Sequence, residues 1–324
     1  MNRFSPLVLF GLIVCVLSCK KDPEILIDDQ EANQIEAYLD EAGLSAIVGQ
    51  DTSGLYAYPI TLNPGGKSQA EGKVLRFFYQ MSLLDSTIID SYDSLDADTL
   101  MVKQGANAIY PVGVDYALSY LKEGEKWGFI LPSRIAFGAF SYSSLIPENA
   151  IVRVDIELLE ILSEEDILDD ELDRINSYIS TEALRDTVAN PLNQPELLPN
   201  GMVFKRLRAG GSLRPAPDSL ITVTYEGRFL SNEVFDRAPN ADAFEFFYGQ
   251  EQTIPGFEIG IGRMAVQEAA LVIMPSYLAY RESAQVIPPF LTNEMIDLEI
   301  VPAYIAKVGP YEPLIFEIQL IGVN

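Results

Sequence analysis

Residues 223–236 read VTYEGRFLSNEVFD, and residues 77–90 read FFYQMSLLDSTIID. Both stretches place a tyrosine eleven residues before an aspartate, and each is followed by a glycine nineteen residues before a proline. The tyrosine–aspartate pairs are Tyr79 with Asp90 and Tyr225 with Asp236, and the glycine–proline pairs are Gly113 with Pro132 and Gly256 with Pro275. An internal repeat at this offset predicts two tandem copies of one domain.

Local patterns predict the same elements in both copies. In the second copy, Ile221, Val223 and Tyr225 alternate with polar residues, as in a half-buried antiparallel strand. A short helix is predicted after each repeated glycine, and apolar residues at helical spacing predict a further helix before each copy. The leading helices carry Ile35, Tyr38 and Leu39 in one copy and Ile175, Tyr178 and Ile179 in the other. The predicted fold class is therefore α+β, with two tandem domains, each an antiparallel β-sheet wrapped around a short helix.

The second copy carries a series of motifs in a fixed order. They are Val223-Thr224-Tyr225-Glu226-Gly227, Val234-Phe235-Asp236, Phe244-Glu245-Phe246, Thr253-Ile254-Pro255-Gly256-Phe257-Glu258, Met274-Pro275-Ser276-Tyr277-Leu278-Ala279-Tyr280 and Leu314-Ile315-Phe316-Glu317-Ile318. This order resembles the FKBP-type peptidyl-prolyl cis-trans isomerase family from about residue 200 to residue 324. Residues 53–162 are similar to that family in skeleton.

The resemblance implies an aromatic pocket that receives a proline side chain. Transferred residue by residue, its lining would be Tyr225, Phe235, Phe244, Phe257, Tyr280 and Phe316, with Phe257 in place of the indole that usually forms the floor. It also implies that Ile254 donates its backbone N–H to the substrate carbonyl, that Asp236 hydrogen-bonds at the rim, and that Tyr280 presents its hydroxyl.

The first copy departs from this pattern. Ile89, Val114 and Val154 stand at the positions of Phe235, Phe257 and Phe316, and Phe137 stands at the position of Tyr280. We therefore expect isomerase activity in the second domain and a degenerate first domain that serves binding, spacing or dimer contacts.

The second copy also has a longer loop before its last strand. About 19 more residues separate Tyr280 from Phe316 than separate their counterparts in the first copy, and Arg281 replaces Gly138. We expect this enlarged loop, residues 281–312, to overhang the pocket of the second domain. Pro288, Pro289 and Pro302 are candidates to occupy that pocket from within.

Composition excludes several classes of function. The chain has no histidine, which removes Ser-His-Asp triads, imidazole bases and His-ligated zinc. The net charge of −25 argues against nucleic-acid binding. The acidic clusters at 164–166 and 169–171 lack the ligand spacing of a calcium loop and are predicted to be a solvated linker face. We expect no metal and no cofactor.

The N-terminal residues predict a lipoprotein. An apolar run over Leu7–Leu17 ends in Ser18-Cys19, which resembles a bacterial lipobox with Cys19 as the lipidated residue. The alternative is an ordinary signal peptide with an incidental cysteine. The predicted segments are a signal peptide (1–18), a tether (19–30), a first domain with its leading helix (31–162), an acidic linker and helix (163–199), and a second domain (200–324).

These features predict a peptidyl-prolyl cis-trans isomerase of the cell envelope. It would be anchored by its N-terminal lipid, with the outer membrane as the expected site, and would act on proline-containing segments of exported proteins. The alternatives are an FKBP-like binding protein or chaperone without turnover, or a structural subunit of an envelope assembly.

Overall fold

The structure is a computed structural model, and it describes residues 23–92, 100–106, 108–181, 194–301 and 308–324. Cys19 and Pro302 lie outside the described residues, so the lipidation site and one of the three candidate prolines have no structural account.

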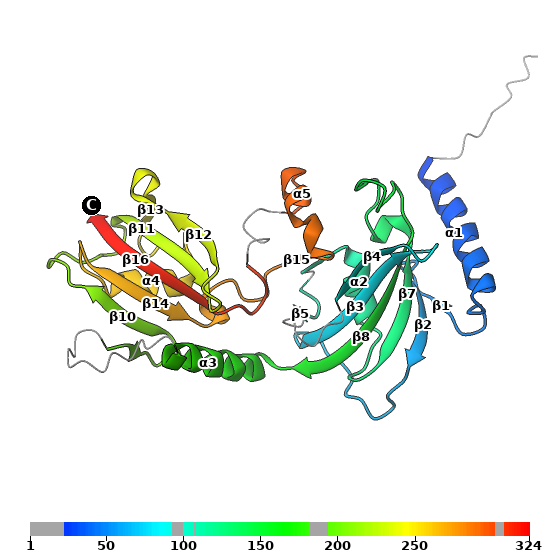
Figure 1. Ribbon diagram of the computed structural model, residues 1–324, viewed down its shortest axis with the longest axis horizontal. Coiled ribbons are helices and arrows are strands. Elements are labelled where there is room, and N and C mark those ends of the chain that lie inside the picture. Colours follow the sequence, from blue (N-terminus) through cyan, green and yellow to red (C-terminus); the bar gives the residue numbers. More distant parts are fainter. Residues whose placement is uncertain (1–22, 93–99, 107, 182–193, 302–307) are drawn as a thin grey trace, which may run out of the picture.

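The first domain is built on a seven-stranded antiparallel sheet (Figure 1). Its strands follow the order β1-β2-β7-β8-β3-β4, and β5 pairs with β3. The strands are β1 (Gly49–Gln50), β2 (Tyr56–Thr61), β3 (Val74–Leu83), β4 (Ile88–Tyr92), β5 (Leu100–Lys103), β7 (Lys126–Leu131) and β8 (Val152–Leu162). The short helix α2 (Val112–Leu118) contacts β8 and buries Val114 and Leu118 against the sheet.

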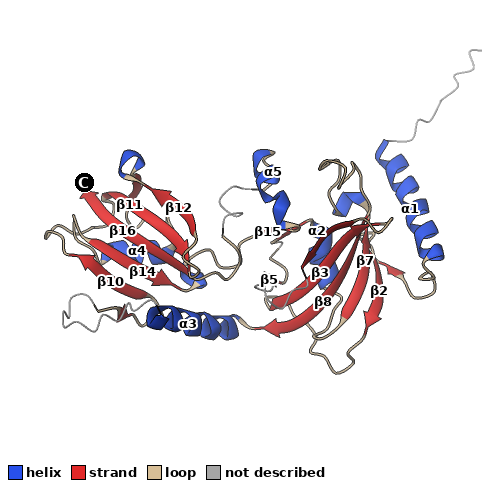
Figure 2. Ribbon diagram, in the orientation of Figure 1, coloured by secondary structure: helices blue, strands red, loops and turns tan. Residues whose placement is uncertain are grey.

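The second domain repeats this architecture strand for strand. Its order is β12-β11-β16-β14-β10-β9, and β13 pairs with β11. The strands are β9 (Glu196–Leu197), β10 (Val203–Arg208), β11 (Leu220–Phe229), β12 (Val234–Ala238), β13 (Phe244–Phe247), β14 (Ala269–Met274) and β16 (Leu314–Val323). Helix α4 (Pro255–Gly262) contacts β14 and β16 as α2 contacts the first sheet. Figure 2 shows the two sheets side by side, each with its own helix, and the α+β tandem prediction is confirmed.

A leading helix precedes each sheet, at α1 (Pro23–Glu41) and α3 (Glu164–Thr181). Helix α1 ends just before Gly43, whose φ of +69° suits the left-handed turn that stops a helix. Helix α1 begins earlier than the sequence predicts, since it includes residues 23–30 of the predicted tether (19–30). Proline is favoured at the first turn of a helix, which accounts for the start at Pro23. Within the described residues, no helix is both apolar and long enough to cross a lipid bilayer.

The two leading helices dock through the same buried contact. Glu31 of α1 accepts hydrogen bonds from the backbone N–H of Ser133, at 2.9 Å, and from its hydroxyl. Glu171 of α3 accepts the same pair from Ser276, with the N–H at 2.7 Å. Both carboxylates are almost fully buried. The prediction that residues 169–171 form a solvated face is therefore wrong for Glu171, because Ser276 supplies the donors that a buried carboxylate requires.

Burial gives Glu171 a pH-dependent effect on stability. The pKa of this carboxyl is raised from 4.5 to about 7, because burial and the nearby Glu312 outweigh the Ser276 donors and Arg174, which lower it. The folded chain therefore holds a proton that the unfolded chain releases between these values. The contribution of this group to the free energy of unfolding is greatest below pH 4.5 and falls as the pH rises to about 7. Above that pH the contribution stays constant, and the total change is about 3 kcal/mol.

Glu171→Gln is expected to remove this dependence, because the amide keeps the shape of the side chain and does not titrate. The free energy of unfolding of the second domain, followed by circular dichroism at pH 5 and pH 8, would fall by about 3 kcal/mol in the parent chain and change little in the variant. Glu31→Gln makes the same change under the first domain and should leave that slope in place. Equal slopes in all three proteins would contradict the prediction.

The enlarged loop reaches the first domain. It forms the short strand β15 (Gln285–Val286), a 3-10 turn (Pro289–Leu291) and helix α5 (Thr292–Asp297), which lies between the two sheets in Figure 1. Strand β15 pairs in parallel with β6 (Ile109–Tyr110) of the first domain. The expectation that Pro288 and Pro289 occupy the site of the second domain is therefore wrong, since the apolar residues around them pack into the first domain.

Candidate functional site

Five aromatic rings of the second domain meet in one cluster. Phe257 of α4 lies 5.2 Å from Phe316 of β16 and 5.4 Å from Tyr225 of β11, between ring centroids. Phe235 of β12 lies 5.7 Å from Phe316, and Phe244 of β13 lies 6.1 Å from Tyr225. All four pairs are edge-to-face, an arrangement that aromatic quadrupoles favour. We call these five residues the aromatic cluster.

The aromatic cluster has a buried base and an accessible rim. Phe257 and Phe316 form the base, with 3% and 4% of their surfaces exposed. Tyr225, Phe235 and Phe244 are half-buried, so their edges face solvent. Tyr280, which follows β14, is also half-buried. Such an arrangement offers an apolar surface to a small ring while leaving polar tips in reach of a peptide.

Gly227 makes room for this packing. It lies in β11 directly opposite Phe316, and a Cβ atom there would come within 2.7 Å of the Phe235 ring and 3.0 Å of the Phe316 ring. In the first domain the corresponding pair is Met81 opposite Val154. The second domain therefore combines a glycine with two large rings, whereas the first domain combines the large side chain of Met81 with smaller aliphatic residues.

The rim carries hydrogen-bonding groups with high pKa values. The Tyr225 hydroxyl donates to Oδ2 of Asp236 at 2.7 Å. Burial, with Asp236 nearby, raises the pKa of the hydroxyls of Tyr225 and Tyr280. Both tyrosines therefore stay protonated at neutral pH and can donate hydrogen bonds.

Ile254 lies at the N-terminal end of helix α4. It is the N-cap residue, and its carbonyl accepts hydrogen bonds from the N–H groups of Phe257 and Glu258. Among the residues that the structure describes, no group accepts the N–H of Ile254. The corresponding N-cap of α2 in the first domain is Pro111, which has no N–H to offer.

Sequence reasoning missed two residues beside the aromatic cluster. Phe246 is buried and stacks on Phe244, with centroids 5.6 Å apart. Because side chains two residues apart face the same side of a strand, the Phe244-Glu245-Phe246 motif carried this signal. Tyr277 has no predicted role. Its hydroxyl donates to the carbonyl of Asn200 at 2.6 Å, which connects the segment before β10 to the segment after β14.

The first domain keeps the polar pair but not the rings. The Tyr79 hydroxyl donates to Asp90, as its counterpart does in the second domain. One hydrophobic cluster buries Ile89, Val114 and Val154 together with Phe137. Tyr79 itself is only 2% exposed, so its ring is closed to solvent where Tyr225 is half-buried.

Comparisons with known proteins agree with this geometry. The family described as FKBP-type peptidyl-prolyl cis-trans isomerase matches residues 65–159 and 211–321, more than half of the chain. A probable FKBP-type peptidyl-prolyl cis-trans isomerase, FkpA, from Neisseria meningitidis serogroup B is 27% identical over 125 residues, which are 39% of this chain and 39% of that protein. Human peptidyl-prolyl cis-trans isomerase FKBP9 is 24% identical over 213 residues, which are 65% of this chain and 31% of that protein.

Among solved structures, the three FKBP domains of wheat FKBP73 align with 84% of this chain and 96% of theirs, at 18% identity and a TM-score of 0.33. The matched family regions fall one on each sheet, in keeping with the repeat. This chain is a member of the FKBP-type peptidyl-prolyl cis-trans isomerase family and carries two domains of that family in tandem.

Proposed function

We propose that the second domain isomerises X-Pro peptide bonds, and that the aromatic cluster receives the proline ring. The observation that carries this proposal is the buried base of Phe257 and Phe316 beneath a half-buried rim, with the Ile254 N–H beside it. The first domain has Val114 and Val154 in place of the two base rings, and it lacks this N–H.

The chemistry requires no acid, base or metal. An amide resists rotation by about 18–20 kcal/mol because resonance keeps it planar, and the twisted state loses that resonance and its polarity. An apolar base that contacts the proline ring favours the twisted state over the planar one. The Ile254 N–H would hold the carbonyl before proline, while the Tyr280 hydroxyl would bind the adjacent peptide and Asp236 would position Tyr225.

Tyr225→Phe is expected to lower kcat/KM about ten-fold, because it removes the hydroxyl that fixes Asp236 at the rim and one charge-assisted hydrogen bond. The assay is the slow, proline-limited phase of refolding of a model protein, which lasts tens of seconds without a catalyst. Tyr79→Phe removes the matching hydroxyl from the first domain and should leave the rate unchanged. Equal losses in the two variants would contradict the assignment to the second domain.

We further propose that the chain is a lipid-anchored protein of the cell envelope that assists the folding of exported proteins. The support is the apolar run Leu7–Leu17 followed by Ser18-Cys19. In cells fed labelled palmitate, the parent chain should carry label in the outer-membrane fraction, and Cys19→Ala should carry none. Label retained in the variant would contradict the proposal.

A further inference from the structure

The enlarged loop of the second domain binds the first domain by its backbone. We call residues 281–312 the insert. The N–H of Gln285 donates to the carbonyl of Ala108, and the N–H of Ile287 donates to the carbonyl of Tyr110, both at 2.8 Å. This is strand addition, in which an extended segment pairs with the edge of another domain. Backbone pairing of this kind accepts many sequences and leaves selectivity to the side chains.

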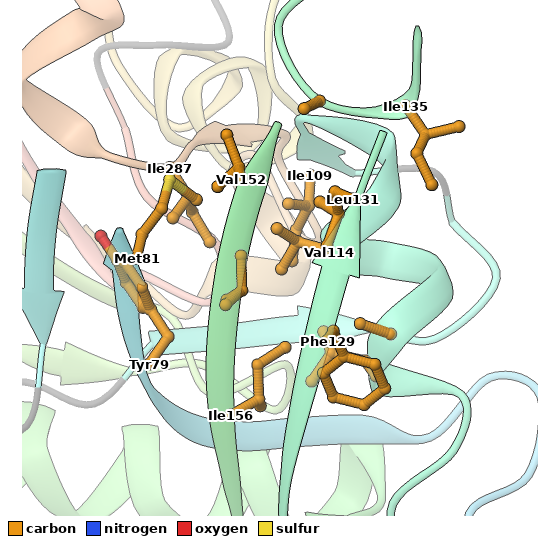
Figure 3. Close-up of a cluster of buried hydrophobic side chains, with 14 of the residues drawn as sticks. Tyr79, Met81, Ile109, Val114, Phe129, Leu131, Ile135, Val152, Ile156 and Ile287 are labelled. Carbon is orange, nitrogen blue, oxygen red and sulfur yellow. The ribbon is translucent and has the colours of Figure 1, made fainter. Parts of the chain in front are cut away.

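The insert then buries aliphatic side chains in the first domain. Ile287, Leu291 and Met295 are all fully buried, although they belong to a loop of the other domain. They share one apolar cluster with Tyr79 and Val114. Figure 3 shows Ile287 beside Met81 and Val152, among residues of the first domain. We call the first-domain residues of this apolar cluster, together with β6, the docking site.

The docking site occupies the position that the aromatic cluster has in the second domain. Tyr79, Ile89, Val114, Phe137 and Val154 line it, and their counterparts are Tyr225, Phe235, Phe257, Tyr280 and Phe316. In the first domain, the buried cluster of these smaller residues also includes Ile287, Leu291 and Met295 of the insert. The same region that offers an open rim in one domain therefore holds a bound segment in the other.

Polar contacts at the edge of the docking site fix the register of the insert. The side-chain amide of Gln285 donates to the carbonyl of Met101 at 2.5 Å, and Glu282 pairs with Lys103 at 3.7 Å. At its base, the insert is closed by the Tyr311 N–H, which donates to the carbonyl of Arg281 at 2.8 Å. These contacts hold the start of the insert against the first domain and close the base of the insert.

We propose that the docking site is a binding site for an extended aliphatic peptide segment, that the insert is its resident ligand, and that the insert keeps it closed to other polypeptides. A tethered ligand acts at an effective concentration on the order of millimolar, so free segments of moderate affinity do not displace it. Docking also draws the insert away from the aromatic cluster of the second domain, whose rim stays half-buried.

The test opens the docking site and supplies the ligand separately. Ile287→Glu places a charge where the side chain is fully buried, so the insert should leave. Trp127 of β7 is the one tryptophan of the chain, and its fluorescence reports unfolding of the first domain. A synthetic peptide with the sequence of residues 283–296 is then added. It should raise the Trp127 melting temperature of the variant and bind it at least ten-fold more tightly than it binds the parent chain.

The controls separate charge and folding from release. Leu298→Glu adds the same charge to the insert at a residue that is 56% exposed, and it should behave as the parent chain does. If Ile287→Glu leaves the first domain unfolded, Gln285→Pro takes its place, because it removes one of the two backbone donors without a charge in the core. Peptide binding by Gln285→Pro in excess of the parent chain supports the proposal. Equal binding by the parent chain and the released variant, or binding by neither, overturns it. These readouts do not involve isomerase activity.

Discussion

Phe257→Ala is expected to lower kcat/KM for X-Pro isomerisation at least 100-fold. Phe257 contacts the rings of Tyr225, Phe244, Phe246 and Phe316, so its removal opens the base of the aromatic cluster. A 100-fold loss corresponds to about 2.7 kcal/mol of lost transition-state stabilisation. The same deletion destabilises a folded domain by about 3–5 kcal/mol, so the variant must be assayed where the second domain remains folded.

A chemically identical substitution in the first domain supplies the control. Phe129 is fully buried in the first sheet, and Phe129→Ala should destabilise that domain while leaving the isomerase rate intact. Circular dichroism confirms folding in each case, since Trp127 lies in the first domain and stacks on Phe129. If Phe257→Ala, folded, retained the parent rate, the proline ring would have to bind elsewhere. If Phe129→Ala lost activity equally, the assignment to one domain would fail.

Gly227→Val is expected to have the second large effect. The new Cβ would come within 2.7 Å of Phe235 and 3.0 Å of Phe316, and the two methyl groups would extend further into the rings. Overpacking of this kind costs about 1–3 kcal/mol in stability and displaces the rings that form the base and rim. We expect kcat/KM to fall at least ten-fold, measured with a short Phe-Pro peptide.

The matched control is Gly322→Val on the neighbouring strand β16. A Cβ at Gly322 meets only Thr222, at an ordinary contact distance of 3.7 Å, so the substitution should be tolerated. Similar losses of activity at both positions would show that valine acts through general strand effects. A loss at Gly227 alone would support close packing of the rings as the source of activity.

Much of the fold could be predicted because the sequence repeats itself. Spacings such as Tyr79 to Asp90 and Tyr225 to Asp236 mark equivalent strands, and alternation at Ile221 and Val223 gives their buried face. The sequence also carried a signal for the docking of the leading helices, which the prediction did not use. Glu31 and Glu171 lie four positions before Ile35 and Ile175, which places each glutamate on the apolar face of its helix.

The rings of the aromatic cluster were implied by the resemblance of the second copy to the FKBP-type family, because the order and spacing of its motifs match. The destination of the insert could not. Its residues Ile287, Leu291 and Met295 recur every four positions, which indicates an apolar face that needs a partner. A repeat identifies equivalent segments, but it does not say which domain a long loop contacts, because that depends on the distance and orientation between domains.

The most direct test of the central claim is exchange NMR on a short Phe-Pro peptide in the presence of the protein. We expect cis–trans exchange well above the uncatalysed rate, which is slow enough to take tens of seconds or more. We also expect Phe257→Ala to abolish the acceleration. Exchange no faster than that of the peptide alone, from protein shown to be folded, would contradict the claim that the second domain is an isomerase.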